Sequence, residues 1–180
     1  MRPDIRLEPF GEQHLGAYAR ILDDPEIQRF TTVPPPPNQD YPRTWLRRYE
    51  QGRVDGTREA FAILDGADGS YLGTAVAFGI DRETSTAELG YVVAPEARGR
   101  GVATETLRRL TRWAFEALGT YRIELVINVD NEASKRVAQK CGYTFEGTLR
   151  GLYAKADQRA DGEMWSRLAT DPEPSNQTDR

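Results

Sequence analysis

Two glycines and two arginines alternate where a predicted strand gives way to a long predicted helix. The segment reads Arg98-Gly99-Arg100-Gly101-Val102-Ala103-Thr104. The first turn of a helix carries unpaired N–H groups and a partial positive charge, which together bind phosphate. Glycine has no Cβ, so Gly99 and Gly101 let a diphosphate approach the backbone, and the arginines add charge. The segment predicts a phosphate site, with a tight turn that binds nothing as the alternative.

Two common phosphate-binding motifs do not fit this segment. The dinucleotide fingerprint needs a third glycine three residues after the second, and Thr104 stands there instead. No strand–helix–strand pattern precedes it. A P-loop needs Gly-Lys followed by Ser or Thr, which is absent. Both motifs are therefore excluded.

A few other polar residues are candidates for chemistry. Glu88 alternates with Leu89 in a strand-like segment and so faces away from the apolar side, as a solvated glutamate also would. Asn131 precedes a predicted helix and suits an N-cap. Cys141 is the sole cysteine and His14 the sole histidine. We assign both to structural roles, because disulfides and zinc sites need more ligands, and we expect no metal.

The segment from Arg98 to Ala103 resembles the acetyl-CoA loop of the GNAT acetyltransferase superfamily, written Gln/Arg-x-x-Gly-x-Gly/Ala. Asn131-Glu132-Ala133-Ser134 is similar to the Asn-x-x-Ser that opens the next helix in the RimJ/RimL-like branch of that superfamily. Lys140-Cys141-Gly142-Tyr143 is similar to its Lys-x-Gly-Phe. The resemblance is specific between Glu88 and Gly147.

The resemblance implies acetyl-CoA as co-substrate and a primary amine as acceptor. It implies that the backbone of one strand pairs with the pantetheine arm, that one of its N–H groups, near Val93, holds the oxyanion, and that the glycine turn holds the diphosphate. Asn131 bonds the pantetheine amide, and Ser134 lies near the sulfur. The coenzyme-binding residues implied are Tyr91, Val92, Val93, Arg98, Gly99, Arg100, Gly101, Val102, Ala103, Thr104, Asn131 and Ser134.

The proton transfers are also assigned through the resemblance. Glu88 is the expected base, with Glu124 on the following strand as its competitor. We expect Glu88→Gln to lower the rate most at low pH, where the amine most needs to lose a proton. Many GNAT enzymes use a tyrosine acid seven residues after the asparagine, where this chain has Ala138. Ser134 is then the only hydroxyl expected near the departing thiolate.

The resemblance places the acceptor pocket at the first two predicted helices and their loop. Phe30 and Tyr41 are expected to line it, whereas core packing is favoured for Trp45. The basic side chains of the last predicted helix, Lys135, Arg136 and Lys140, are read either as a site for the 3′-phosphate of CoA or as an exposed face.

The elements that must position these residues follow from two periodicities. Apolar alternation predicts strands, and apolar spacing of three and four predicts helices. The predicted strands are Asp4–Phe10, Glu59–Leu64, Tyr71–Ile80, Thr86–Val93, Ile123–Val129, Tyr143–Leu149 and Glu163–Leu168. The predicted helices are Gln13–Leu22, Tyr41–Arg53, Asn131–Lys140 and one from Val102 to a C-cap at Gly119. Pro34–Pro37 predict a stiff, extended loop.

The order of these elements predicts an α/β fold of GNAT type with a mixed (α+β) sheet. An antiparallel meander is followed by strand, helix, strand and helix, with about seven strands and four helices in all and helices on both faces. Residues 1–169 are expected to form the acetyltransferase domain. Residues 170–180 are expected to form a disordered tail, because they hold two prolines and almost no apolar side chain.

Charge and hydropathy exclude several classes of protein. Lys and Arg number 24 against 28 Asp and Glu, so there is no overall basic excess for nucleic acid. The uncharged runs Phe30–Gln39 and Gly69–Ile80, the latter the longest in the chain, are both too short to span a bilayer. Residues Met1–Asp4 lack the apolar segment of a signal peptide. We expect a cytoplasmic enzyme without nucleic-acid or membrane partners; a homodimer is common in the branch.

Three functions stay open at this point. The first is acetylation of a protein N-terminal α-amine, as in the RimJ/RimL-like branch. The second is acetylation of a small amine such as an amino acid, a polyamine or an antibiotic. The third is a regulatory module that binds acyl-CoA without catalysis. The presence of Glu88, Asn131 and Ser134 argues against this third function.

Overall fold

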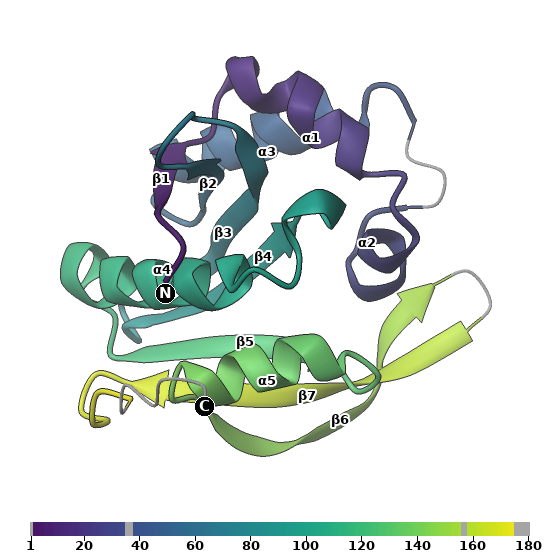
Figure 1. Cartoon of the computed structure of the whole chain (residues 1–180). Coiled ribbons are helices and arrows are strands. Elements are labelled where there is room, and N and C mark those ends of the chain that lie inside the picture. The colour runs from purple at the N-terminus through teal and green to yellow at the C-terminus, as the bar shows by residue number, and fades with distance from the viewer. Residues whose placement is uncertain (1, 35–37, 156–157, 175–180) are drawn as a thin grey trace.

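The computed structural model describes residues 2–34, 38–155 and 158–174. In these ranges seven strands form one mixed sheet with the order β1-β2-β3-β4-β5-β7-β6 (Figure 1). The strands are β1 (Ile5–Pro9), β2 (Glu59–Asp65), β3 (Tyr71–Asp81), β4 (Thr86–Val93), β5 (Arg122–Asn128), β6 (Thr144–Lys155) and β7 (Gln158–Leu168). The helices are α1 (Leu15–Ile21), α2 (Pro25–Phe30), α3 (Tyr41–Val54), α4 (Val102–Leu118) and α5 (Glu132–Lys140), with 3-10 turns η1 (Glu12–His14) and η2 (Pro95–Ala97). The predicted α/β architecture with a mixed sheet is confirmed.

Helix α2 is the element that the sequence did not predict. The pattern predicts a helix that ends before Pro25, and α1 does end at Ile21. Pro25, however, stands in the first turn of α2, where its missing N–H costs nothing and its fixed φ suits the helix. Asp24 caps α2 by accepting a hydrogen bond from the Ile27 amide at 2.9 Å. The described helices therefore number five instead of the four predicted.

The last two strands are longer than predicted. The sequence indicated Tyr143–Leu149 and Glu163–Leu168, whereas β6 runs to Lys155 and β7 begins at Gln158. The β6–β7 register shifts twice, once between Phe145 and Gly147 and again between Leu149 and Tyr153. Each shift interrupts the alternation of side chains that identifies a strand in a sequence. The shifts explain why the outer half of this hairpin was missed.

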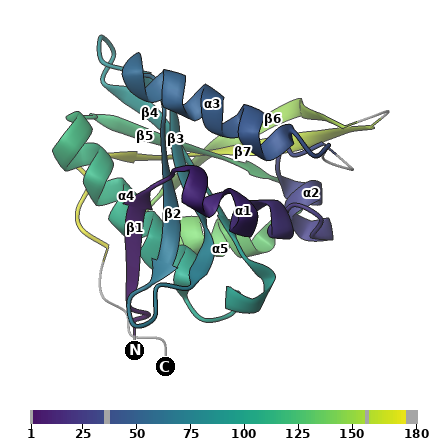
Figure 2. The ribbon, with the colours of Figure 1, turned by 90° about the horizontal axis from the view of Figure 1, so that it is seen from above.

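The sheet lies between α3 on one face and the neighbouring helices α4 and α5 on the other (Figure 2). On the α3 side, Trp45 is buried with its ring centroid 5.1 Å from Phe10, 4.7 Å from Tyr18 and 4.4 Å from Tyr49. Such ring contacts add to the stabilisation from apolar burial. The core role expected of Trp45 is confirmed.

The ends of α4 and α5 lie where the sequence placed them. Gly119 follows α4 in the left-handed conformation, with φ of 68°, as a C-cap glycine does. Asn131 precedes α5 and accepts a hydrogen bond from the Ser134 amide at 3.1 Å. These caps fix the lengths of the two helices that flank the candidate site.

Two loop expectations fall partly outside the described residues. Residues 35–37 of the proline loop and residues 175–180 of the expected tail lie outside the described residues. The start of that tail differs from the expectation, because Asp171 accepts a hydrogen bond from the Leu168 amide at 2.8 Å and Glu173 pairs with Arg167. Across the described ranges, every helix is too short or too polar to cross a membrane.

Candidate active site

The two central strands of the sheet run parallel but pair only at their beginnings. Thr86, Ala87 and Glu88 of β4 pair with Arg122, Ile123 and Glu124 of β5, and the ladder stops there. Beyond that point β4 continues to Val93 and β5 to Asn128 without pairing with each other, and the strands diverge (Figure 1). We call the region between Leu89–Val93 and Leu125–Asn128 the β4–β5 split.

Alternate residues of β4 direct their backbone groups into the split. The Ala94 amide donates to Leu72 of β3, and the Ser85 carbonyl accepts from Arg122 of β5. Backbone groups alternate in direction along a strand, so Leu89, Tyr91 and Val93 face the split. Polar backbone groups inside a sheet need partners. This part of β4 offers the N–H and C=O groups that an added strand, or an amide-bearing ligand, would use.

This alternation corrects the expectation for Val92. Its backbone groups face β3, where its register partner is Thr74. A Cβ on Gly73 would lie 2.1 Å from the Val92 carbonyl oxygen, so the two strands are in close contact there. Tyr91 and Val93 keep the predicted orientation, whereas Val92 can contact a ligand in the split only through its side chain.

The glycine turn has the conformation that its residues predicted. Gly99 and Gly101 have φ of 72° and 79°, in the left-handed region that favours glycine. A Cβ built on Gly99 would meet no atom within 4 Å, so the space beside this backbone is open. Gly101 is the N-cap of α4 and supplies no capping side chain. The N–H groups of Val102, Ala103 and Thr104 therefore lack a side-chain cap, which suits an anion.

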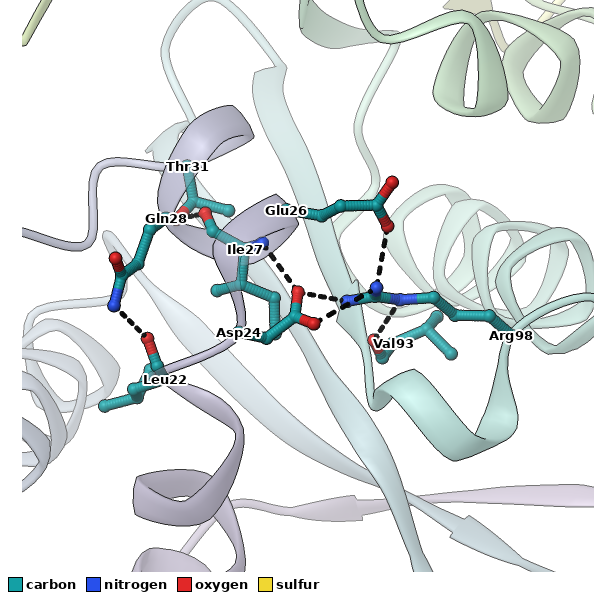
Figure 3. A network of polar contacts seen from close by, with 8 residues as sticks. All are labelled: Leu22, Asp24, Glu26, Ile27, Gln28, Thr31, Val93 and Arg98. Atoms are coloured by element: carbon teal, nitrogen blue, oxygen red, sulfur yellow. Dashed lines mark hydrogen bonds and ion pairs between the residues drawn. The ribbon is translucent and has the colours of Figure 1, made fainter. Parts of the chain in front are cut away.

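The two arginines of the turn differ in what they contact. The guanidinium of Arg98 bonds to Asp24 and Glu26 of the α2 region and to the Val93 carbonyl, as Figure 3 shows. Arg100 is exposed, with its guanidinium 3.8 Å from Asp65 and its charge also acting on Asp68. Arg100 is therefore the less tightly held of the two arginines, and the expectation that Arg98 adds charge at the mouth is corrected, because two carboxylates already pair with it.

Ser134 and Tyr91 bring two hydroxyl groups together on the α5 side of the split. The Tyr91 hydroxyl is buried and has no hydrogen-bond partner of good geometry. Burial raises the pKa of Tyr91 to about 12, and the nearby Ser134 side chain opposes this rise. The sequence predicts Ser134 as the only hydroxyl near the departing thiolate. The structure places the Tyr91 hydroxyl there as well. A buried hydroxyl without a partner is costly and points to a missing ligand.

Glu88 lies at the closed end of the split, where β4 and β5 separate. Burial and, as the smaller cause, the negative charge of neighbouring Glu124 together raise the pKa of its carboxyl group to about 7. Glu124 is already engaged, because the Arg122 Nε lies 2.7 Å from its carboxylate. The same guanidinium donates two more hydrogen bonds to Glu146, at 2.8 and 2.6 Å. Of the two carboxylates, Glu88 is the one without a cation.

Tyr153 also reaches the split, and the sequence analysis missed it. Its hydroxyl donates to the carbonyl of Val126, a β5 group that faces the split, at 3.0 Å. Burial and, as the smaller cause, the charge of Glu88 together raise the pKa of Tyr153 to about 12. Tyr153 lies in the outer half of β6, beyond the predicted end of that strand, so no signal in the sequence connected it with Glu88.

The residues expected to line the acceptor pocket lie on two different elements. Phe30 ends α2, is half-buried, and has the Arg29 guanidinium 4.8 Å from its ring centroid. Tyr41 begins α3, packs against the core and hydrogen-bonds Tyr18. Lys135, one of the cations considered for the 3′-phosphate, is paired with Glu132 at 2.9 Å and Glu163 at 2.7 Å.

Comparisons with known proteins place this geometry in a family. Residues 4–144 match the family model described as acetyltransferase (GNAT) domain. The chain is 34% identical over 146 residues to "Putative ribosomal N-acetyltransferase YdaF" of Bacillus subtilis, covering 79% of this chain and 72% of that protein.

Two solved structures share the fold. One is RimL, the ribosomal L7/L12 alpha-N-protein acetyltransferase, in complex with coenzyme A. It has a TM-score of 0.84 and 20% identity, over 92% of this chain and 94% of that one. The other is spermidine N-acetyltransferase from Vibrio cholerae in complex with CoA and spermine. It has a TM-score of 0.81 and 21% identity, over 92% and 95% of the two chains.

The contact between Glu88 and Glu124 leads to a prediction that can be tested without a substrate. Replacing Glu124 by Gln removes the charge beside Glu88, so the pKa of Glu88 should fall below its present value of about 7. Carboxyl ¹³C NMR titration measures this, with the Glu88 signal assigned from its loss in Glu88→Gln. Glu83→Gln, on the exposed turn before β4, is the control. An unchanged or raised pKa in Glu124→Gln would contradict the described geometry.

Proposed function

Because this chain belongs to the GNAT acetyltransferase family and is an acetyl-CoA-dependent N-acetyltransferase, we propose that its acceptor is the α-amine at a protein N-terminus. The observation that carries the site assignment is the β4–β5 split. Its unpaired β4 edge lies between the uncapped start of α4 and the carboxyl group of Glu88. One binding region thus runs from a phosphate site to a base.

The residues present fit acetyl-CoA. We infer that the N–H groups from Gly99 to Thr104 hold its diphosphate, with Arg100 adding charge. Tyr91 and Val93 offer backbone groups to the pantetheine arm, as a neighbouring strand would. Asn131 uses its side-chain oxygen as the cap of α5, which leaves its amide N–H₂ for the coenzyme. The buried Tyr91 hydroxyl lies beside Ser134 but has no partner of good geometry among the described residues, so a bound ligand would satisfy it.

Glu88 is proposed as the general base. An α-ammonium group has a pKa of about 7.7–8.0, so at neutral pH most of the acceptor must lose a proton before it attacks the thioester. A carboxyl group with a pKa of about 7 is matched to that task. The Val93 N–H faces the split and is the donor proposed for the oxyanion. The Arg98 Nε holds the Val93 carbonyl at 3.3 Å, which fixes that part of the backbone.

Ser134 is proposed to donate a hydrogen bond to the departing sulfur. The Tyr91 hydroxyl lies next to the Ser134 hydroxyl. A free thiol has a pKa of about 8.5, so the thiolate leaves without a strong acid. The Ser134 hydroxyl can rotate between the sulfur and the Tyr91 oxygen, because a hydroxyl is both donor and acceptor. Holding the two reactants in position contributes more, up to roughly 7–11 kcal/mol.

The charges around the split favour an acceptor with a single amine over a polyamine. Glu124 and Glu146 share Arg122, and Asp130 pairs with Arg29 at 3.1 Å. A polyamine carries several cations, each of which needs an uncompensated carboxylate. Each of the other carboxylates contacts an arginine, although Glu124 and Glu146 share one, as do Asp24 and Glu26. Glu88 has no arginine partner among the described residues and is assigned to the base. One α-amine suits this arrangement.

The acceptor assignment predicts a substrate order. Release of CoA thiol should be faster with short peptides that carry a free α-amine than with spermidine, spermine or free amino acids, by about tenfold or more in kcat/KM. The same peptides with acetylated N-termini are the control. A preference for spermidine would reject the protein acceptor. Coenzyme binding with no turnover on any amine would favour a regulatory module.

The loss of activity in Glu88→Gln should be largest above pH 8. The wild-type rate should rise through pH 7 as the Glu88 carboxylate forms, and the variant should lack this rise. We expect a loss of roughly 100-fold at pH 8.5 that shrinks below pH 6, where Glu88 is protonated in the wild type. This reverses the expectation from sequence, which considered only the protonation of the amine and not that of Glu88. A ratio of the two rates that does not change with pH would remove Glu88 from the role of base.

Ser134→Ala should lower kcat by no more than about tenfold, because the thiolate is a good leaving group. Tyr91→Phe should also have a small effect on kcat, and it should not lower the unfolding temperature, since it removes a buried hydroxyl without a good partner. Steady-state kinetics and thermal unfolding test the two variants. A loss of 100-fold in Ser134→Ala would show that an acid is required there.

A further inference from the structure

Helix α2 lies across the open end of the β4–β5 split and is attached on both sides of it. On the β4 side, Arg98, which follows the end of β4, contacts Asp24 and Glu26 (Figure 3). On the β5 side, Arg29 contacts Asp130, two residues after the end of β5. Because parallel strands end at the same edge of a sheet, one short helix can connect the two diverging strands.

The attachment through Arg98 uses all three nitrogens of its guanidinium. Nη2 lies 2.6 Å from Asp24 Oδ1, and Nη1 lies 3.3 Å from Asp24 Oδ2 and 2.7 Å from Glu26 Oε2. Nε donates to the Val93 carbonyl at 3.3 Å. The planar guanidinium forms a two-pronged contact with a carboxylate, which fixes direction as well as distance.

Asp24 connects this contact to the helix itself. The same oxygen, Oδ1, accepts a hydrogen bond from the Ile27 amide and so caps α2. Ile27 is buried, at 3% exposure, and the side chain of Asp24 is 14% exposed. Hydrogen bonding to Arg98 and to the Ile27 amide lowers the pKa of Asp24 against the effect of its burial. The Asp24 carboxylate is thus held between the cap of α2 and the end of β4.

The two attachments of α2 differ in strength. The side chains of Arg29 and Asp130 are 62% and 61% exposed, and exposed single ion pairs contribute little. Arg98 and Asp24 are 31% and 14% exposed and form a two-pronged pair. Of the two ion-pair attachments of α2, the one through Arg98 is therefore the stronger, and it acts together with the burial of Ile27.

We propose that Arg98 and Asp24 are positioning residues that hold α2 at the acceptor side of the split, and that the Arg98 guanidinium is not a ligand of the coenzyme diphosphate. The inference rests on the proposed function only in assigning the acceptor side. One guanidinium faces two carboxylates, Asp24 and Glu26, so this cluster carries a net negative charge that does not attract an anion. Arg100 supplies the positive charge of the turn.

The alternative is that Arg98 leaves Asp24 to bind the diphosphate, and the two arrangements predict opposite results for Asp24→Asn. If Arg98 is a diphosphate ligand that Asp24 restrains, neutralising Asp24 releases it and tightens the binding of CoA. If Arg98 is a positioning residue, neutralising Asp24 leaves the dissociation constant of CoA within about twofold and raises the acceptor KM by about tenfold.

The experiment compares wild type, Asp24→Asn, Arg98→Met and Arg98→Lys by calorimetric titration with CoA and by kinetics with an α-amine peptide. Arg98→Lys keeps the charge but not the planar fork, so it should behave like Arg98→Met instead of restoring the acceptor KM. Arg43→Met removes an arginine of an ion pair on α3 that is more exposed than Arg98, at 57% against 31%, and serves as control. Unchanged CoA affinity also shows that a variant is folded.

Hydrogen exchange provides a readout that needs no turnover. The amides of Ile27, Gln28 and Thr31 are bonded within the α2 region. They should exchange about tenfold faster in Asp24→Asn and Arg98→Met, and at the wild-type rate in Arg43→Met. If the wild type lacks transferase activity, the proposed function fails, while exchange and CoA titration still test the inference. Tighter CoA binding in Asp24→Asn, weaker CoA binding in Arg98→Met, or unchanged α2 exchange would overturn it.

Discussion

A strand edge inside a sheet needs hydrogen-bond partners, and this requirement governs the site. β4 is paired with β3 along its whole length, but β5 leaves it after Glu88. The backbone groups of Leu89, Tyr91 and Val93 then face a neighbouring strand that has moved away. Buried N–H and C=O groups are costly when unpaired, so a fold that keeps this edge open is built around a ligand that pairs with it.

The groups at the two ends of the split follow from its geometry. At the closed end, the strands are near enough to place the carboxylates of Glu88 and Glu124 side by side. Arg122, which also pairs with Glu146, contacts Glu124 but not Glu88. The remaining repulsion and the burial keep Glu88 partly protonated near pH 7. At the open end, β4 runs into the glycine turn and the uncapped start of α4. The groups proposed for proton transfer and for phosphate binding thus lie at opposite ends of one strand.

Sequence reasoning worked where a residue's task is local. Gly99 and Gly101 need a left-handed conformation, Asn131 caps a helix, and the period-two segments form strands; each depends on neighbours in the chain. It could not reach contacts that depend on a partner far along the chain. Arg98 was expected at the diphosphate, and its contact with Asp24, 74 positions away, is visible only in the structure.

Pro25 and Tyr153 show two other limits. Proline both ends and begins helices, so Pro25 alone did not reveal α2. The bulges in β6 hid the strand that carries Tyr153 to the split. The pKa of Glu88 was also out of reach, because it depends on burial and on Glu124, whose place beside Glu88 is set by the register of two strands.

A crystal structure of the complex with coenzyme A tests the central claim most directly. The account predicts the diphosphate on the N–H groups between Gly99 and Thr104, and the pantetheine amides on the backbone of Tyr91 and Val93. Arg98 should remain on Asp24. Coenzyme bound elsewhere, with the glycine turn empty and side chains filling the space between β4 and β5, would contradict it.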